Sequence, residues 1–326
     1  MNTGNGQPLL EVRNLKKHFL PQKKLFEEQA PPVRAVDGIS FTLQAGETLG
    51  LVGESGCGKS TAARTLLRLI EPSSGQVNFF GTNLFGLKEA QMRNLRKEMQ
   101  IIFQDPYSSV NPARRVGHIL QEPFEIHGCQ NKKENAEKAT QLLEHVGLTS
   151  GHFNQYPHEL SGGQLQRVGI ARAIALNPKL VVADEPVSAL DVSIQAQIIN
   201  LLLDLKEKQD ISYLFISHDM RVVEYFCDRI AVMYLGKIVE IADSKQIYNS
   251  PQHPYTTALL NAIPSVESGR VKQQAFIKGD IPDSTSAQKG CAFHNRCPIK
   301  EKKCEEEIPT LKKIAPGHHV ACFLKH

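Results

Sequence analysis

Apolar and polar positions along the chain follow two different periods. Short, almost wholly apolar runs are typical of strands that are buried within a parallel sheet, and they occur at residues 48–52, 99–103, 179–184 and 211–217. Apolar residues recur at helical spacing in segments that follow or separate these runs, at residues 62–70, 131–146, 165–176 and 192–208. The pattern therefore predicts an α/β fold.

Two segments depart from this alternation. At the start of the chain, residues 9–15 alternate well enough for a strand, residues 33–44 read as strand, turn and strand, and a polar loop separates them at 21–32. These segments predict antiparallel strands. Farther along, helical patterns at residues 114–127 and 131–146 follow one another without an intervening strand, which indicates a helical insertion.

A glycine-rich loop connects the first buried run, at residues 48–52, to the helix at 62–70. It reads GESGCGKST and fits G-x-x-x-x-G-K-[ST], whose glycines let backbone N–H groups approach anionic oxygens at a helix N-terminus. Lys59 would reach the β- and γ-phosphates of a nucleotide, and Ser60 would give its hydroxyl to Mg²⁺. The alternative is a glycine-rich turn that binds nothing, but strand, lysine, hydroxyl and helix all agree. We expect the nucleotide to be bound by Gly53, Ser55, Gly56, Cys57, Gly58, Lys59, Ser60 and Thr61.

A second glycine-rich segment, LSGGQ at residues 160–164, precedes the amphipathic helix at 165–176. Two glycines and a serine at a helix N-terminus form an anion site by the same physics as the first loop. The residues of this site are Ser161, Gly162, Gly163 and Gln164. Two such sites in one chain require an explanation.

Four polar residues follow buried strands, and one aromatic residue precedes the first loop. Asp184 is placed to hold Mg²⁺ through water, and Glu185 is the candidate that polarises the attacking water. His218 stands at the sheet edge where ligands collect and would contact the γ-phosphate, while Gln104 would sit beside Mg²⁺ or the attacking water. Phe19 would be a platform on which adenine stacks. The structural alternatives are two loop-capping acids, a structural or solvated histidine, a glutamine that merely ends a strand, and a core phenylalanine.

Composition serves mainly to exclude classes of protein. The length of 326 residues suggests one large domain with an appendage, or two domains. The net charge of +4 is spread along the chain without an aromatic-interleaved basic block, so nothing indicates a nucleic-acid partner. No segment approaches the roughly 20 apolar residues of a membrane span, and the polar first residues lack the regions of a signal peptide. We expect a cytoplasmic chain whose seven cysteines are thiols or metal ligands rather than disulfides.

The motifs, taken in chain order, resemble those of the ATP-binding subunit of an ATP-binding cassette (ABC) transporter. The resemblance covers residues 9–264 and rests on GESGCGKS, the Gln104 loop, LSGGQ, VVADEP, SALD at 188–191, and His218. It implies a P-loop NTPase of the ABC ATPase type, with a RecA-like mixed sheet core, an antiparallel β subdomain and an inserted helical subdomain. In that family two subunits meet head to tail, which explains the second anion site. The residues that would then act in trans are Ser161, Gly162 and Gly163, and Asp191 would line the shared interface.

A narrower resemblance is to the subunits of oligopeptide and dipeptide importers, the OppF/DppF type. It rests on the stretch at residues 33–61, on IFQDPYSSVNP, and on residues 234–264, where Pro-Tyr-Thr precedes a short helix. Two positions depart from the family pattern. Leu165 stands where arginine is frequent after the signature, and Val110 stands where leucine is usual. Neither touches a phosphate-binding role, so we expect activity to survive both.

The end of the chain carries four cysteines with the spacing C-x5-C-x6-C-x17-C: Cys291, Cys297, Cys304 and Cys322. This spacing matches neither the C-x2-C pairs of most structural zinc sites nor the usual ferredoxin runs, so the residues alone leave unliganded thiols open. The tail of the peptide-importer family has a similar pattern that can hold a [4Fe–4S] cluster, and this resemblance favours a cluster over zinc or no metal. The additional ligands for a zinc site would be His294, His318 and His319. Cys129 and Cys227 fall outside the set.

The resulting hypothesis divides the chain into an ABC nucleotide-binding domain at residues 1–264, with a helical subdomain at about 105–160, and an extension with the four-cysteine motif at 265–326. The chain would hydrolyse MgATP at a dimer interface and drive the import of oligopeptides or dipeptides through membrane subunits. The expected metal ligands for Mg²⁺ are Ser60, Gln104 and Asp184. The expected catalytic residues are Glu185, His218 and Gln104.

The resemblance also implies partners and a location. The partners would be a second ABC ATPase subunit in a heterodimer, two transmembrane permease subunits and an extracytoplasmic substrate-binding protein, at the cytoplasmic face of the inner membrane. One alternative is the same machinery for nickel or another small solute. Another is a soluble ABC ATPase acting on nucleic acid or ribosomes, although such proteins usually carry two cassettes or a coiled-coil insertion. A P-loop kinase or GTPase has no use for LSGGQ, and intact Glu185 and His218 argue against a subunit that binds ATP without hydrolysing it.

Overall fold

The computed structural model describes residues 7–21, 31–129, 131–263 and 289–325. Within them the chain divides into two compact units. The first unit comprises residues 44–48 and 86–216, and the second comprises residues 7–43, 49–85 and the described chain from 217 onward. Both units mix strands and helices, as the α/β prediction requires.

The first unit is built on three parallel strands in the order β8-β7-β6. These are β6 (Met99–Ile102), β7 (Leu180–Asp184) and β8 (Ser212–Ser217). Ala183 pairs with Ile102 on one side and with Phe215 on the other. Every residue of β7 and β8 is buried, which explains why their sequences are continuously apolar instead of alternating. The strands predicted at 99–103, 179–184 and 211–217 are confirmed to within one residue at each end.

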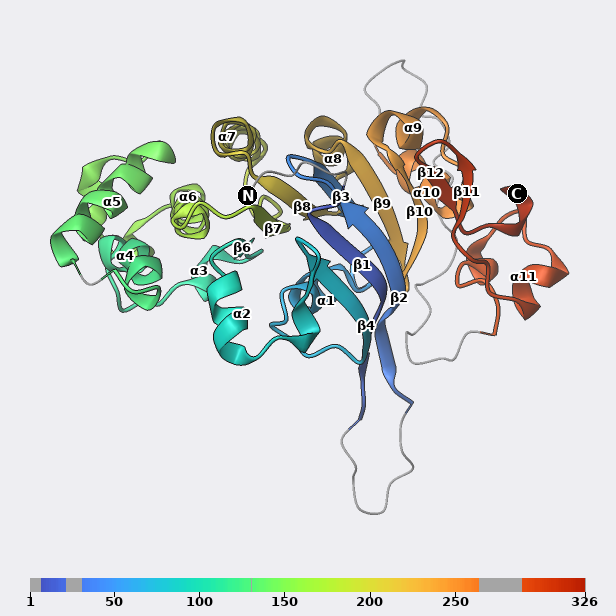
Figure 1. Cartoon of the computed structure of the whole chain (residues 1–326). Helices are drawn as coiled ribbons and strands as arrows, with labels where there is room; N and C mark the ends of the chain where they lie inside the picture. Colours follow the sequence, from blue (N-terminus) through green and yellow to red (C-terminus); the bar gives the residue numbers. More distant parts are fainter. Residues whose placement is uncertain (1–6, 22–30, 130, 264–288, 326) are drawn as a thin grey trace, which may run out of the picture. The chain divides into compact units, whose positions relative to one another are not determined.

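The helices of the first unit include the predicted insertion. They are α2 (Glu89–Leu95), α3 (Pro106–Ser109), α4 (Val116–Ile126), α5 (Lys132–His145), α6 (Gly162–Ile174) and α7 (Val192–Gln209), with short 3₁₀ turns η2 (Ser150–Asn154) and η3 (Pro157–Glu159). Helices α4, α5 and α6 pack against one another (Figure 1). Helix α5 begins where the Asn131 side chain accepts hydrogen bonds from two backbone N–H groups, and it buries Ala139, Leu142 and Leu143 on one face.

The second unit begins with an antiparallel sheet in the order β2-β1-β4-β5. Its strands are β1 (Leu10–Phe19), β2 (Val33–Leu43), β4 (Ser74–Phe79) and β5 (Thr82–Asn83), and β1, β2 and β4 run side by side in Figure 1. The predicted strand, turn and strand at 33–44 is wrong, because β2 is one strand. Gly38, with φ 87°, forms a bulge between the pairs that β1 makes with Ile39 and Asp37, so β2 bends without ending.

The second unit also contains strands in the order β11-β12-β10-β9-β3. These are β3 (Thr48–Val52), β9 (Arg229–Tyr234), β10 (Lys237–Asp243), β11 (Lys312–Ala315) and β12 (His318–Val320). Strands β3 and β9 are parallel, whereas β10, β12 and β11 add in antiparallel fashion. The sheet is therefore mixed, and the end of the chain supplies two of its strands. His318 bonds the buried carboxylate of Glu240 at 2.7 Å and fixes this attachment.

The helices of the second unit are short. They are α1 (Lys59–Leu66), α8 (Met220–Phe226), α9 (Ser244–Asn249), α10 (Pro254–Asn261) and α11 (Lys302–Glu306), with 3₁₀ turns η1 (Leu84–Gly86), η4 (His294–Arg296) and η5 (Phe323–Lys325). Helix α1 starts earlier and ends earlier than the predicted 62–70. It stops because Arg68 adopts φ 50°, a left-handed conformation that a helix cannot continue through.

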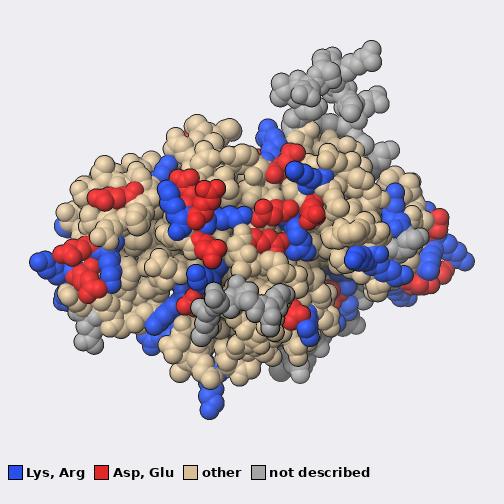
Figure 2. All heavy atoms as spheres, turned by 45° about the horizontal axis from the view of Figure 1, so that its top comes forward, with Lys and Arg blue, Asp and Glu red and all other residues tan. Residues whose placement is uncertain are grey.

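The surface that Figure 2 shows is mixed in charge, in keeping with the modest net charge of the chain. On the face shown in Figure 2, basic and acidic side chains of the described residues stand beside one another instead of forming a field of one sign. Among the described residues, no helix combines the length and the apolar character that are needed to cross a bilayer. The domain boundary expected at 264–265 lies outside the described residues.

Candidate functional site

The phosphate loop lies in the second unit, between β3 and α1. Its glycines adopt conformations that other residues avoid, with φ 154° at Gly53 and φ 106° at Gly58, which precedes α1. A side chain at either position would also overlap backbone atoms: a Cβ at Gly53 would meet the carbonyl of Met233, and one at Gly58 that of Ala35. Both conformation and space therefore require glycine at these two positions.

Lys59, the first residue of α1, lies inside this loop. Its side chain is almost fully buried, and Nζ donates hydrogen bonds to the carbonyls of Gly53 at 2.8 Å and Glu54 at 3.1 Å. The loop thus fixes an ammonium group beside a helix N-terminus, so that both positive charges act on the same anion. Ser60 follows in the first turn of α1 and is half-buried.

The remaining residues of the loop differ in exposure. Ser55 and Gly56 are exposed, and Thr61 is half-buried in α1. Cys57 is buried: its Sγ lies 3.9 Å from Nζ of Lys59, and burial raises the pKa of its thiol. The N–H of Cys57 donates to the carbonyl of Glu54, and its carbonyl accepts from the N–H of Gly236. The backbone of Cys57 therefore shapes the loop while its thiol faces the interior.

Two further candidates of the second unit are at the surface. Phe19 ends β1 with 41 % of its surface exposed, and the ammonium of Lys17 lies 4.9 Å from its ring centroid. Its ring is not part of the core, so it is available for stacking. His218 follows β8 and is exposed, and the side chain of Asp219 caps α8 by accepting a hydrogen bond from the N–H of Arg221.

In the first unit, Gln104 and Glu185 come together although 81 residues separate them in the chain. Nε2 of Gln104 donates to Oε2 of Glu185 at 3.0 Å. Glu185 has φ 48°, a strained conformation for a residue that is not glycine, and its N–H donates to the carbonyl of Ile216 at the end of β8. Such strain is maintained where the surrounding structure requires a side chain to point in one direction. Asp184, which ends β7, is buried.

The LSGGQ segment forms the N-terminus of α6 in the first unit. Ser161 accepts a hydrogen bond from the N–H of Gln164, whose side-chain carbonyl accepts from the N–H of Ser161 at 2.9 Å. A Cβ at Gly163 would lie 2.7 Å from Cγ2 of Ile194 in α7. Asp191 precedes α7 and is exposed. Gly163 thus allows α6 and α7 to approach closely.

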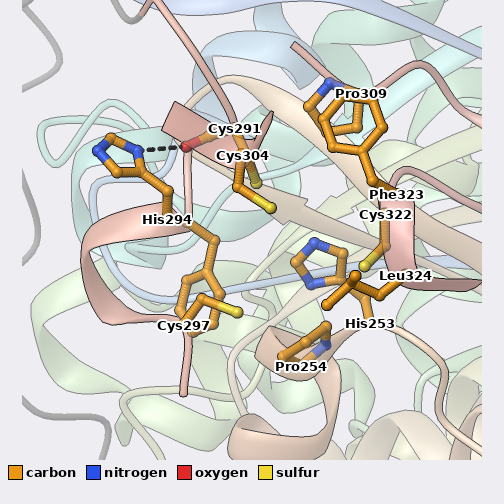
Figure 3. Close-up of a pocket in the computed structure, with 11 residues that line it drawn as sticks. His253, Pro254, Cys291, His294, Cys297, Cys304, Pro309, Cys322, Phe323 and Leu324 are labelled. Carbon is orange, nitrogen blue, oxygen red and sulfur yellow. Dashed lines mark hydrogen bonds between the residues drawn. The ribbon is translucent and has the colours of Figure 1, made fainter. Parts of the chain in front are cut away.

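The four cysteines of the C-terminal region line one small pocket in the second unit (Figure 3). Their sulfur atoms face the interior of the pocket from different sides. The N–H of Cys291 donates to the carbonyl of Cys304 at 2.7 Å, and burial raises the pKa of the Cys291 thiol to about 11. Among the described residues, no three His, Cys, Asp or Glu side chains are arranged to hold a single metal ion.

The histidines near the cysteines differ from those expected for a zinc site. His294 lines the pocket, and its Nδ1 bonds the carbonyl of Cys291 at 2.7 Å. His253, which the sequence analysis does not single out, also lines it. His318 and His319 lie in β12 and are not among the lining residues. Cys129 and Cys227 lie elsewhere, as expected.

Three residues that the motifs do not point to meet at the phosphate loop: Glu54 inside it, and Arg296 and Tyr255 outside it. Glu54 bonds Arg296, and the hydroxyl of Tyr255 accepts a hydrogen bond from the N–H of Glu54. Two signals were available, because Arg296 lies just before Cys297 and Tyr255 lies in the Pro-Tyr-Thr motif. Neither feature of the sequence predicts a contact with Glu54, because more than 200 positions separate each residue from it.

Comparisons with known proteins agree with this geometry. A family model described as "ABC transporter" matches residues 36–188, and one described as "Oligopeptide/dipeptide transporter, C-terminal region" matches residues 239–304. The chain is 50 % identical over 327 residues to the Oligopeptide transport ATP-binding protein AppF of Bacillus subtilis, which covers 99 % of both chains. It is 49 % identical to the probable peptide ABC transporter ATP-binding protein y4tS of Sinorhizobium fredii, over 97 % of this chain and 90 % of the relative.

A solved structure is similar over the cassette. It is the dimeric ATP-binding cassette MJ0796 in a post-hydrolysis state with ADP and phosphate, with a TM-score of 0.63 and 28 % identity over 72 % of this chain and 98 % of that chain. This likeness confirms the ABC ATPase fold. The chain belongs to the ATP-binding subunits of ABC transporters, of the type that carries the oligopeptide/dipeptide transporter C-terminal region, and it is an ATPase.

Proposed function

We propose that this chain hydrolyses MgATP between two ATP-binding subunits and thereby drives the import of oligopeptides or dipeptides through membrane-spanning partners. The observation that carries the proposal is the similarity to an oligopeptide transport ATP-binding protein over 99 % of both chains. The phosphate loop and the Gln104–Glu185 pair supply the chemistry that this function requires. The cassette would comprise residues 1–264, with its helical subdomain at about 105–160, and the extension residues 265–326.

In this proposal the second unit binds the nucleotide. The phosphates lie on the loop at residues 53–61 with Lys59 as their cation, and adenine stacks on the exposed ring of Phe19. Mg²⁺ prefers oxygen donors, and within this unit the hydroxyl of Ser60 suits the ion. The γ-phosphate contacts His218.

Glu185 activates the attacking water. Its strained backbone fixes the direction of the carboxylate, and the amide of Gln104 donates a hydrogen bond to one carboxylate oxygen and so helps to orient it. As the resemblance to ABC ATP-binding subunits implies, Ser161, Gly162 and Gly163 act on the nucleotide of a second subunit, and Asp191 lines the shared interface. Nucleotide binding then favours the closed pair and hydrolysis releases it. We infer that the second subunit is a related ATPase in a heterodimer.

The membrane partners would meet the loop at residues 104–112. This loop follows β6 and contains α3, which is capped by Asp105 and exposes half of Tyr107. Arg172 of α6 donates to the carbonyl of Ser109 and ties the loop to the helix that carries the signature. The subunit would thus work at the cytoplasmic face of the inner membrane, with two permease subunits and an extracytoplasmic binding protein in the complex and no nucleic acid.

We also propose that the four cysteines hold a [4Fe–4S] cluster. The four cysteines line one pocket, and the resemblance of the tail to that of the peptide-importer family favours a cluster over zinc. When bound, a cluster would tie together a region that has little core of its own. Anaerobic purification with assays of iron, sulfide and zinc tests this: about four irons per chain support a cluster, whereas stoichiometric zinc or no metal contradicts it.

The experiment for the whole proposal is reconstitution in vesicles with the subunits that co-purify from native membranes. We expect two multi-span subunits, a second ATPase, and ATP hydrolysis that rises when a peptide-loaded binding protein is supplied. Stimulation by nickel instead of peptide would contradict the solute. Recovery of ribosomes or nucleic-acid proteins without membrane subunits would contradict transport.

A further inference from the structure

Glu54, the second residue of the phosphate loop, is held from outside the loop at both its side chain and its backbone. Arg296 of the cysteine region binds its carboxylate, and Tyr255 at the start of α10 binds its N–H. All these residues belong to the second unit. Arg296 stands directly before Cys297, so the residue that grips the loop is the neighbour of a residue that lines the cysteine pocket.

The contact between Glu54 and Arg296 is a two-pronged ion pair. Nη1 donates to Oε2 at 2.8 Å, and Nη2 donates to Oε1 at 3.0 Å. The arginine side chain is 6 % exposed and the glutamate side chain 22 %, and Nη1 also donates to the hydroxyl of Tyr234 at 3.3 Å. A planar fork of this kind fixes orientation as well as charge, which a surface ion pair between flexible chains does not.

The backbone of Glu54 in turn positions the lysine that faces the phosphates. Its carbonyl accepts hydrogen bonds from Nζ of Lys59 at 3.1 Å and from the N–H of Cys57 at 3.3 Å, while its N–H donates to Tyr255 at 2.8 Å. Because these contacts converge on one residue, displacement of Glu54 moves an acceptor of Lys59.

A packed aromatic group joins Tyr255 to the cysteine pocket. The ring centroid of Phe293 lies 5.4 Å from that of Tyr255, 5.3 Å from that of Tyr234 and 5.8 Å from that of His253. Phe293 and His253 line the pocket, and both are almost fully buried. Close packing transmits small displacements, so the pocket and the loop cannot shift independently.

We propose that Arg296 and Tyr255 are positioning residues for ATP binding. They clamp Glu54 and hold the phosphate loop in the conformation that accepts a triphosphate, which makes the cysteine region a determinant of nucleotide affinity. This inference rests on the proposed function, because it takes the loop at residues 53–61 as the ATP site. The C-terminal region thereby gains a role that does not depend on whether the pocket holds a metal.

The test replaces Arg296 by glutamine in the full-length chain and measures binding of a fluorescent ATP analogue to this subunit together with steady-state hydrolysis by the assembled complex. A loop that is competent for only a tenth of the time raises both Kd and KM about tenfold. At saturating ATP, kcat changes by less than about twofold, since ground state and transition state lose the same contact. Tyr255→Phe removes one hydroxyl and weakens binding by about threefold. The control is Lys300→Gln, which removes a cationic partner of Glu305 from the same region and leaves Kd unchanged.

A double-mutant cycle tests whether Arg296 affects ATP affinity through Glu54. Once Arg296→Gln is present, Glu54→Gln adds little to the loss of affinity, because both changes break one contact. If Arg296→Gln lowers the melting temperature but leaves Kd for ATP unchanged, the pair only attaches the tail and the inference is wrong. Failure of the unmodified chain to bind ATP would instead contradict the proposed function. If Arg296→Gln does not fold, Tyr255→Phe and Arg296→Lys decide, and the lysine variant, which keeps the charge without the fork, is expected to show an intermediate Kd.

Discussion

The phosphate loop at residues 53–61 and the signature at residues 161–164 are both glycine-rich segments that open a helix, but they meet different constraints. In the loop, Gly58 precedes α1 with φ 106° and no side chain caps the helix. In the signature, Ser161 and Gln164 cap α6 with a reciprocal pair of hydrogen bonds. The start of α1 therefore has no side-chain cap, whereas the start of α6 is capped by two of its own side chains.

This difference indicates how each segment can serve an anion. The phosphate loop surrounds the buried ammonium of Lys59, so it offers a phosphate both N–H groups and a full positive charge. The four residues of the signature bring no cation, and Gly163 serves the close approach of α6 to α7 at Ile194. The loop is therefore suited to bind a nucleotide by itself, whereas the signature is suited to complete a site that another segment has already formed.

The largest effect is expected at Glu185, which the proposal places in ATP hydrolysis but not in ATP binding. Glu185→Gln keeps the size and one acceptor of the side chain but removes the base, so turnover of the assembled complex should fall by about 10²–10⁴-fold. ATP affinity should be unchanged, because the phosphate loop supplies the binding contacts. Single-turnover hydrolysis and ATP-analogue binding measure the two properties. Turnover at the level of the unmodified enzyme would remove Glu185 from its role and leave Gln104 without a catalytic partner.

The second prediction tests the demand for glycine in the loop. Gly58→Ala combines a left-handed conformation with overlap of the Ala35 carbonyl, and the two costs should weaken ATP binding by at least about 100-fold. Gly56→Ala is the matched control: its φ is 79°, but a Cβ there meets no atom of the described chain within 4 Å. Strain alone should cost this variant about tenfold. Equal losses in the two variants would show that space in the loop is not limiting.

The sequence predicted the parts of the structure that depend on local pattern. The continuous apolar runs at 179–184 and 211–217 became β7 and β8, because both faces of these strands are covered. Helix α7 begins at Val192 as expected, since Asp191 precedes a long amphipathic segment. The phosphate loop between a strand and a helix could also be predicted, because strand, glycines, lysine and helix follow one another directly in the sequence.

The features that escaped prediction depend on contacts between distant residues. Gly38 gave the impression of a turn, but pairing with β1 carries β2 through it as a bulge. Helix α1 ends because the backbone of Arg68 is left-handed, and an arginine in the sequence does not predict this conformation. The grip of Arg296 on Glu54 joins positions 242 residues apart and could not be read from either segment. The pairing of Gln104 with Glu185 could be suspected only because both follow buried strands.

The third prediction concerns the signature, where glycine serves packing. Gly163→Ala places a Cβ against Cγ2 of Ile194, and overpacking of this size should lower hydrolysis by the assembled complex about tenfold. Nucleotide binding to the isolated subunit should not change. Ile194→Ala makes room for the new methyl group, so the double variant should recover most of the activity. Without that recovery, Gly163 would be required for its contact with the nucleotide and not for helix packing.

The smallest effect distinguishes the two segments by the reactivity of a thiol. Cys57 is buried and burial raises its pKa, so the thiolate is scarce near pH 7 and alkylation should be slow, rising about tenfold per pH unit toward that pKa. Ser161→Cys places a thiol at an exposed helix N-terminus, where it should react faster. An adduct on Cys57 would block the loop, so ATP should protect it in the isolated subunit, whereas Cys at 161 should be protected only when the dimer closes. Mass spectrometry of each peptide measures both rates. Equal alkylation rates for Cys57 and for Ser161→Cys at pH 7 would contradict the prediction. They would show that the thiol in the phosphate loop is as accessible as a thiol in the signature.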